Sequence, residues 1–121
     1  MKSLKIFLFA ALVMIFCQKC TSLDPEIGLA SFYSDKFGGK ITASGEVYDQ
    51  RKLTAAHRTL PFNTRIRVTN LNNKRAIIVK VNDRGPFTKD RILDLSKAAA
   101  IKLGFIKNGV TKVMLEILPN E

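Results

Sequence analysis

Apolar and polar residues alternate along several stretches of this chain, and a period of two is typical of strands with one buried face. The alternation is clearest in residues 65–69 (RIRVT), 75–82 (RAIIVKVN) and 110–118 (VTKVMLEIL). Residues 27–33 (IGLASFY) form an apolar and aromatic run that ends at a Ser-Asp pair, and residues 53–57 (LTAAH) form a shorter one. The pattern therefore predicts a domain built mainly from short strands.

Turn and capping residues connect these stretches. Residues 70–74 (NLNNK) predict a hairpin turn between two of the strands, because asparagine tolerates the positive φ that tight turns require. Residues 96–103 (SKAAAIKL) predict one short helix, with Ser96 as its N-cap and Gly104 directly after its last residue. Many short strands with one hairpin and one helix predict a small β-barrel.

The first 20 residues do not share this pattern. Two lysines in residues 1–5 precede an unbroken apolar run of 11 residues, 6–16 (IFLFAALVMIF). A membrane-spanning helix needs about 20 apolar residues, so this shorter run indicates a secretory signal. We expect residues 1–20 to be a signal peptide, 21–26 a polar spacer and 27–119 one folded domain, which suits a chain of 121 residues.

Both cysteines directly follow the apolar run. Cys17 and Cys20 lie outside the predicted domain, which excludes a disulfide framework within it. A cysteine in this place is typical of a lipoprotein, so we predict lipid attachment at Cys20 or Cys17. The residues before them, Lys19 and Phe16, are larger than this attachment usually requires. Ordinary cleavage after Ser22 is the alternative.

The predicted mature part is basic. Residues 1–20 contain three of the 20 Lys and Arg residues and no acidic residue, so 17 basic side chains remain against 10 acidic ones, a net charge of about +7. For an exported protein, the matching polyanions are anionic lipid and peptidoglycan. Nucleic acid is not an expected partner, because the basic residues are scattered singly or in pairs without an aromatic RNA-binding signature.

Three polar blocks interrupt the apolar pattern, and they are TASGEVYD (42–49), TAAHRTLP (54–61) and VNDRGPF (81–87). The first carries two carboxylates three residues apart, Glu46 and Asp49. The second contains His57, the only histidine of the chain. The third places Asp83 at the end of the most hydrophobic predicted strand. Each block thus supplies a side chain that is capable of acid–base or hydrogen-bonding chemistry.

In the same order and with similar spacing, these blocks resemble the rare lipoprotein A (RlpA) family. GLASFY at 28–33 and ILDLSKAAA at 92–100 extend the match, which runs from Gly28 to Leu118. The resemblance implies a mainly β fold, a six-stranded double-psi β-barrel with one or two short helices. It also implies lytic transglycosylase activity on the glycan strands of peptidoglycan, in the bacterial cell envelope and without a cofactor.

The resemblance implies roles for individual residues as well. Asp83 matches the family's catalytic aspartate. The residues that we expect to bind substrate or support the site are Glu46, Tyr48, Asp49, His57 and Arg84. Ser44 and Asn63 depart from the family pattern, which usually has Asn and Gly there, and asparagine still tolerates positive φ. The chain ends at Glu121, so we expect no C-terminal SPOR domain and no septal targeting through one.

A single carboxyl group is enough for the implied reaction. Hydrolysis of a glycosidic bond normally takes two carboxyl groups. A lytic transglycosylase instead uses the 6-hydroxyl of muramic acid as the nucleophile, so proximity replaces the second group. Asp83 could then act first as acid and afterwards as base. Acting as an acid near neutral pH requires a raised pKa, which burial or a carboxylate such as Glu46 or Asp49 would provide.

Each candidate residue also has a structural interpretation. Asp83 could cap its own turn, Glu46 and Asp49 could be solvated loop carboxylates, and His57 could be a structural histidine. Asp94 lies just before the helix N-cap, where negative charge is favourable, so we interpret it as structural. One histidine and no cysteine in the domain leave no recognisable zinc site, and no metal is expected.

Two other classes of function stay open. The barrel could be a non-catalytic, expansin-like module that binds cell-wall glycan through aromatic side chains, for which the candidates are Tyr33, Tyr48, Phe62 and Phe87. It could also be a lipoprotein that serves as a platform for other proteins. An enzyme needs an acid in a groove, a binding module needs exposed aromatic rings along one, and a platform needs neither. We expect a monomer.

Overall fold

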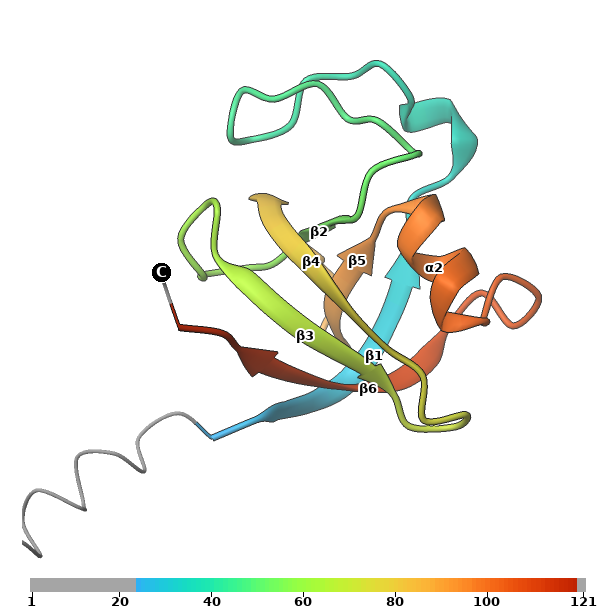
Figure 1. Cartoon of the computed structure of the whole chain (residues 1–121). Helices are drawn as coiled ribbons and strands as arrows, with labels where there is room; N and C mark the ends of the chain where they lie inside the picture. The colour runs from blue at the N-terminus through green and yellow to red at the C-terminus, as the bar shows by residue number, and fades with distance from the viewer. Residues whose placement is uncertain (1–23, 120–121) are drawn as a thin grey trace, which may run out of the picture.

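The computed structural model describes residues 24–119, which fold into a closed barrel with the strand order β1-β5-β2-β4-β3-β6 (Figure 1). The strands are β1 (Glu26–Phe32), β2 (Thr54–Ala56), β3 (Arg65–Asn70), β4 (Ala76–Asp83), β5 (Arg91–Leu95) and β6 (Thr111–Ile117). The 3-10 helix η1 (Asp35–Phe37) and the α-helix α2 (Lys97–Leu103) complete the fold. The six-stranded, mainly β architecture that the resemblance implies is therefore confirmed.

The predicted signal peptide, with Cys17 and Cys20, lies outside the described residues. β1 begins at Glu26, one residue before the predicted start of the domain. Across residues 24–119, the helices are too short or too polar to cross a membrane.

β3 and β4 form the hairpin that the alternating pattern predicts, with antiparallel pairs from Arg65↔Lys80 to Thr69↔Ala76. The turn is present, but its positive φ of 66° belongs to Lys74 and not to an asparagine. The asparagines act through their side chains: the Nδ2 atoms of Asn70 and Asn73 both donate to the carbonyl of Leu103. The reason given for this turn was wrong, and its asparagines instead tie the hairpin to the end of α2.

At Asn63 the expectation from the sequence is confirmed, since this residue has a φ of 72°. The predicted helix caps are also present: the Ser96 side chain accepts from the backbone N–H of Ala99, and Gly104 adopts a left-handed φ of 77°. α2 packs against β1 and β4, which fixes the residues that precede it.

β5 is the strand that the alternating pattern does not reveal. It runs parallel to β1 and antiparallel to β2, and it buries Leu93 and Leu95 completely. It is only five residues long and is followed by Ser96 and then α2. Its apolar residues therefore do not stand out in the sequence from those of the helix that follows. This strand carries Asp94 into the middle of the sheet.

The core fills the barrel and continues under α2. Its largest fully buried side chain is Phe105, which meets the ring of Phe32 edge-on at a centroid distance of 5.7 Å. The other buried members are Ala30, Ala55, Ile66, Val68, Val79, Val81, Leu93, Leu95, Ala99, Ala100, Leu103, Val113 and Leu115. The segment between β1 and β2, drawn in cyan to green, arches over one end of this barrel (Figure 1).

Candidate active site

Strand register places two carboxylates in one row across four neighbouring strands. Ser31 of β1 pairs with Asp94 of β5, Asp94 pairs with Ala56 of β2, and Ala56 pairs with Asp83 of β4. Residues in register on adjacent strands project to the same face, and adjacent strands lie about 4.8 Å apart. Asp94 and Asp83 therefore rise from one face, separated by the small and fully buried Ala56.

A β-bulge in β4 aims Asp83 at this face. β2 pairs Ala55 with Val81 but Ala56 with Asp83, so the pairing skips Asn82. Because side chains alternate along a strand, regular pairing would set Asn82 opposite Ala56 and turn Asp83 to the other face. The extra residue allows Asn82 to be buried, at 3% exposure, while Asp83 reaches solvent.

Both carboxylates line a cleft of about 660 Å³. Its walls come from the segment after β1 that includes η1, and from the loop that joins β4 to β5. The polar and aromatic side chains of its lining include Tyr33, Tyr48, Asp83, Arg84, Phe87 and Asp94. The cleft thus combines carboxylates, phenol groups and aromatic rings, as sites for small polar ligands commonly do.

Three donors fix the carboxylate of Asp83. The backbone N–H groups of Ala43 and Arg84 donate to its Oδ1, each at 2.9 Å. The Tyr33 hydroxyl donates to its Oδ2 at 2.5 Å. Burial of Tyr33, followed by its hydrogen bond to Asp83, holds the pKa of the phenol far above its usual range. Tyr33 therefore stays protonated near neutral pH and acts as a fixed donor to Asp83.

Tyr48 supports Tyr33 and is not an open surface for a ligand. Its side chain is 3% exposed, and its ring meets that of Tyr33 edge-on at 4.7 Å. Its hydroxyl accepts from the backbone N–H of Lys97 at the start of α2. Burial raises the pKa of the Tyr48 hydroxyl above its usual value.

Asp94 lines the cleft, a position that the sequence interpretation did not predict. It lies two residues before the N-cap Ser96, within β5, and its side-chain hydrogen bond and ion pair go to β1 and β5 and not to α2. The Ser31 hydroxyl donates to Asp94 Oδ1 at 2.7 Å, and Arg91 Nε lies 3.7 Å from the same atom. Asp94 is thus a partly buried carboxylate of the cleft. The apolar residues on either side of it, between Asp83 and the helix, are the sequence signal that could have predicted β5 and with it the place of Asp94.

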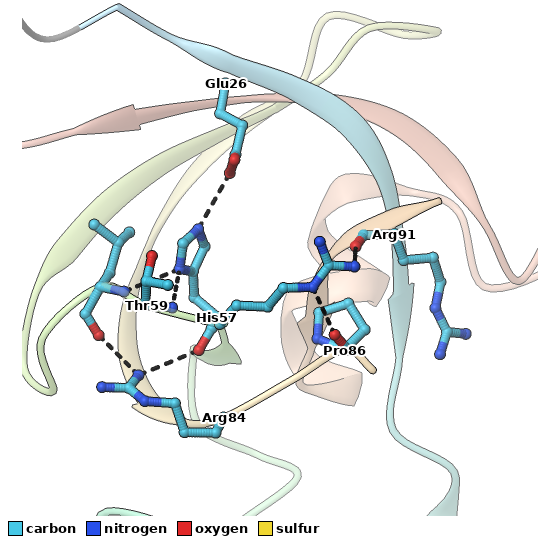
Figure 2. A network of polar contacts seen from close by, with 8 residues as sticks. Glu26, His57, Thr59, Arg84, Pro86 and Arg91 are labelled. Carbon is cyan, nitrogen blue, oxygen red and sulfur yellow. Dashed lines mark hydrogen bonds and ion pairs between the residues drawn. The ribbon is translucent and has the colours of Figure 1, made fainter. Parts of the chain in front are cut away.

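Arg84 and His57 hold the backbone around the cleft. Arg84 Nη1 donates to the carbonyls of His57 and Leu60, at 3.2 and 2.8 Å, and its guanidinium lies 4.1 Å from the centre of the Phe62 ring. His57 Nδ1 accepts from the backbone N–H groups of Thr59 and Leu60 (Figure 2).

The proton of a neutral His57 ring must therefore be on Nε2. That atom lies 3.1 Å from Glu26 Oε1 and donates to it (Figure 2). His57 is 7% exposed and is absent from the lining of the Asp83 cleft. Its contacts are those of a residue that orders the chain beside the site.

Glu46 and Asp49 also lie outside the lining of this cleft. Glu46 forms an ion pair with Lys80 at 2.9 Å. Asp49 pairs with Arg51, whose hydrogen bonds hold the pKa of that carboxyl below its usual value, and it lines a separate, smaller depression. The 42–49 block reaches the site through its backbone, because Ala43 N–H donates to Asp83.

The Tyr33 contact yields a prediction. Tyr33→Phe removes one of the three donors to Asp83 and leaves the ring packed against Tyr48. A hydrogen bond to a charged group is worth roughly 1.5–3 kcal/mol, so we expect the rate of any reaction that depends on Asp83 to fall about tenfold or more. Turnover and melting temperature should be measured together. A rate equal to that of the wild type would mean that Tyr33 does not orient Asp83.

Comparison with known proteins adds to this geometry. A family model described as "Lytic transglycolase" matches residues 26–115. The chain is 55% identical over 91 residues to the "Endolytic peptidoglycan transglycosylase RlpA" of Pasteurella multocida, and the match covers 75% of this chain and 31% of that protein. It is 54% identical over 90 residues to the protein of the same name from Pseudomonas aeruginosa, covering 74% and 26%. The chain thus spans about a third or less of the length of these relatives.

Solved structures show the same barrel. A Streptomyces papain inhibitor superposes with a TM-score of 0.65 at 24% identity, covering 81% of this chain and 98% of that one. A variant of an expansin from Clavibacter michiganensis, in complex with cellohexaose, superposes with a TM-score of 0.66 at 20% identity, covering 81% and 52%. At these identities the likeness concerns the fold alone. Together with the family match and the closed six-stranded order, it identifies a double-psi β-barrel.

Proposed function

Since this chain belongs to the RlpA family, we propose that it is a peptidoglycan lytic transglycosylase. It would cleave glycan strands between N-acetylmuramic acid and N-acetylglucosamine and leave a 1,6-anhydro-muramic end. The observation that carries the proposal is the Asp83 carboxylate, aimed into the cleft by the bulge and held there by Tyr33, Ala43 and Arg84. These contacts hold the carboxyl group in one orientation toward the cleft, and a positioned carboxyl group is what general acid–base catalysis requires.

In the proposed reaction, Asp83 gives a proton to the glycosidic oxygen as the bond from that oxygen to C1 breaks. The 6-hydroxyl of the same muramic residue then bonds to C1, and its proton passes to Asp83, which returns to its starting state. The nucleophile is tethered to the reacting sugar, so no second catalytic carboxyl group is required.

Asp94 in the same cleft favours a second candidate function. Two carboxyl groups in one cleft are what a glycoside hydrolase needs, one to protonate the leaving oxygen and one to activate water or attack C1. The two candidates differ in their products, since hydrolysis leaves a reducing muramic end.

The test is mass spectrometry of peptide-free glycan strands after incubation with the protein. We expect products that end in 1,6-anhydro-muramic acid, which are lighter by one water than hydrolysis products. Reducing ends would replace the transglycosylase by a hydrolase that uses Asp83 and Asp94. Strands that are bound but stay intact would leave a non-catalytic glycan-binding module.

We also propose that the protein is exported to the cell envelope, with residues 1–20 as the signal peptide and lipid attachment at Cys20 or Cys17. The two lysines in residues 1–5 and the apolar run 6–16 that follows them support export. We propose a monomer that needs no cofactor and binds no nucleic acid. Mass spectrometry of the mature N-terminus tests export and lipid attachment, and an intact Met1 would contradict export.

A further inference from the structure

Phe87 is the most exposed large apolar side chain of the described region, at 90% exposure, and it lines the same cleft as Asp83. A Cβ built on Gly85 would lie 3.5 Å from the Phe87 ring and 3.8 Å from Asp94 Oδ2. The ring and the carboxylate therefore flank the same glycine. A single exposed phenylalanine is common on protein surfaces, so the immediate surroundings of this one decide what it means.

The loop that carries Phe87 is fixed from one side by Arg58. Arg58 Nε donates to the carbonyl of Pro86 at 2.8 Å, and its Nη2 donates to the carbonyl of Arg91 at 2.6 Å (Figure 2). The same Nη2 also donates to the carbonyl of Thr88 at 2.5 Å. One planar guanidinium thus binds the carbonyl groups of both residues that adjoin Phe87, Pro86 before it and Thr88 after it. Such a fork sets geometry as well as contributing energy. An exposed ring has no packing of its own to hold it, and here the backbone on both sides is held.

Phe37 and Phe87, two of the three phenylalanines that line the cleft, differ in what contacts their rings. The ammonium groups of Lys36 and Lys40 both lie 5.5 Å from the centre of the Phe37 ring. Across residues 24–119, Phe87 takes part in no aromatic pair and no cation–π contact. Its ring is therefore open to a ligand that enters the cleft.

We propose that Phe87 is the platform on which one pyranose ring of the glycan stacks beside the cleaved bond, and that Arg58 is the positioning residue for this platform. The ligand class rests on the proposed function, while the platform itself rests on exposure, cleft position and the clamp. A sugar ring presents an apolar C–H face with hydroxyls at its edge, which matches a flat apolar ring flanked by Asp94 and Asp83. Holding the ring in advance lowers the ordering cost of binding.

The experiment uses the absence of tryptophan from the chain. Phe87→Trp, made in the full chain together with Asp83→Asn so that the ligand is not consumed, places the sole indole at the platform. We expect its emission to change saturably as peptide-free glycan strands are added. Ile101→Trp in the same background is the matched control, because Ile101 is 56% exposed on α2 and is not part of the cleft lining. Its emission should not respond to glycan.

Two further variants test the platform and its clamp. We expect Phe87→Ala to weaken glycan binding about tenfold, since burying roughly 50 Å² of apolar ring face corresponds to that factor. Arg58→Gln and Arg58→Lys should both lower the fluorescence anisotropy of the introduced indole and weaken binding several-fold. Arg58→Lys keeps the charge but loses the fork, so a lysine variant that behaves as arginine would overturn the positioning role.

The outcomes separate this inference from the proposed function. Anhydro products from the wild-type chain, with an indole at position 87 that does not respond to glycan, would overturn the platform and leave the function standing. A responding indole without cleavage by the wild-type chain would overturn the function and support the platform. Neither response nor cleavage would overturn both.

Discussion

Asp83→Asn should abolish strand cleavage while leaving the fold and glycan binding nearly intact. Asparagine is close in shape to aspartate, and its Oδ1 can still accept from the N–H groups of Ala43 and Arg84. Its amide group can donate to the Tyr33 oxygen, so the local hydrogen bonds persist. It cannot give a proton to the leaving oxygen and take one back, and general acid–base assistance is worth roughly 10²–10⁴-fold in rate. Product yield and melting temperature measured side by side test this.

The matched control for this change is Asp49→Asn. Asp49 also belongs to one of the sequence blocks that match the RlpA family, but it pairs with Arg51 outside the cleft. The rate of cleavage by Asp49→Asn should therefore stay within about twofold of wild type. If Asp83 were a structural turn residue, Asp83→Asn would lower the melting temperature, and activity would fall only as far as stability does. A folded and active Asp83→Asn variant would move the acid to Asp94.

Phe105→Ala should be the most destabilising single truncation in the barrel. Phe105 is 1% exposed and packs edge-on against Phe32. Removing a buried phenylalanine ring costs about 3–5 kcal/mol, because it loses apolar burial and leaves a cavity. In a domain of this size the melting temperature should fall by at least about 12 °C. Calorimetry or circular dichroism would measure it.

Phe105→Ala should also slow the reaction at the candidate site. Phe32 is followed directly by Tyr33, whose hydroxyl orients Asp83, so a loosened Phe32 should slow cleavage even where the variant is folded. The neighbouring Ile106 is 37% exposed, and Ile106→Ala should cost about 1 kcal/mol or less. Equal melting temperatures for the two variants would contradict the assignment of Phe105 to the core.

Local patterns in the sequence predict local structure well here. The β3–β4 hairpin follows from a period of two, and the caps of α2 follow from Ser96 and Gly104, because each signal depends on residues close together in the chain. β5 escapes prediction because its identity depends on partners far away, β1 and β2, and not on its own five residues. Long-range pairing of this kind leaves little trace in a single segment.

The same distinction explains the candidate site. The place of Asp83 in a cleft could be predicted because it ends an apolar strand within a specific block. The position of Glu46 could not, because it pairs with Lys80, 34 residues away in the sequence. Asp49 pairs with Arg51 only two residues later, a local contact that the resemblance to the family gave no reason to prefer over a place in the cleft. Asp94 was overlooked because its closeness to Ser96 in sequence suggested a helix role, whereas strand register brings it near Asp83.

The bulge at Asn82 has a consequence for how such a barrel can diverge. It separates a residue of the core from the proposed catalytic residue, since Val81 is fully buried and Asp83 lines the cleft. The side chain at position 83 can therefore change without repacking the interior. A single substitution there would remove the proposed catalytic carboxyl group at little cost in folding free energy, so related barrels could evolve to bind glycan without cleaving it. Loss of the extra residue would instead turn the last residue of β4, at position 83, away from the cleft, so a deletion at this point should be selected against far more strongly than a replacement.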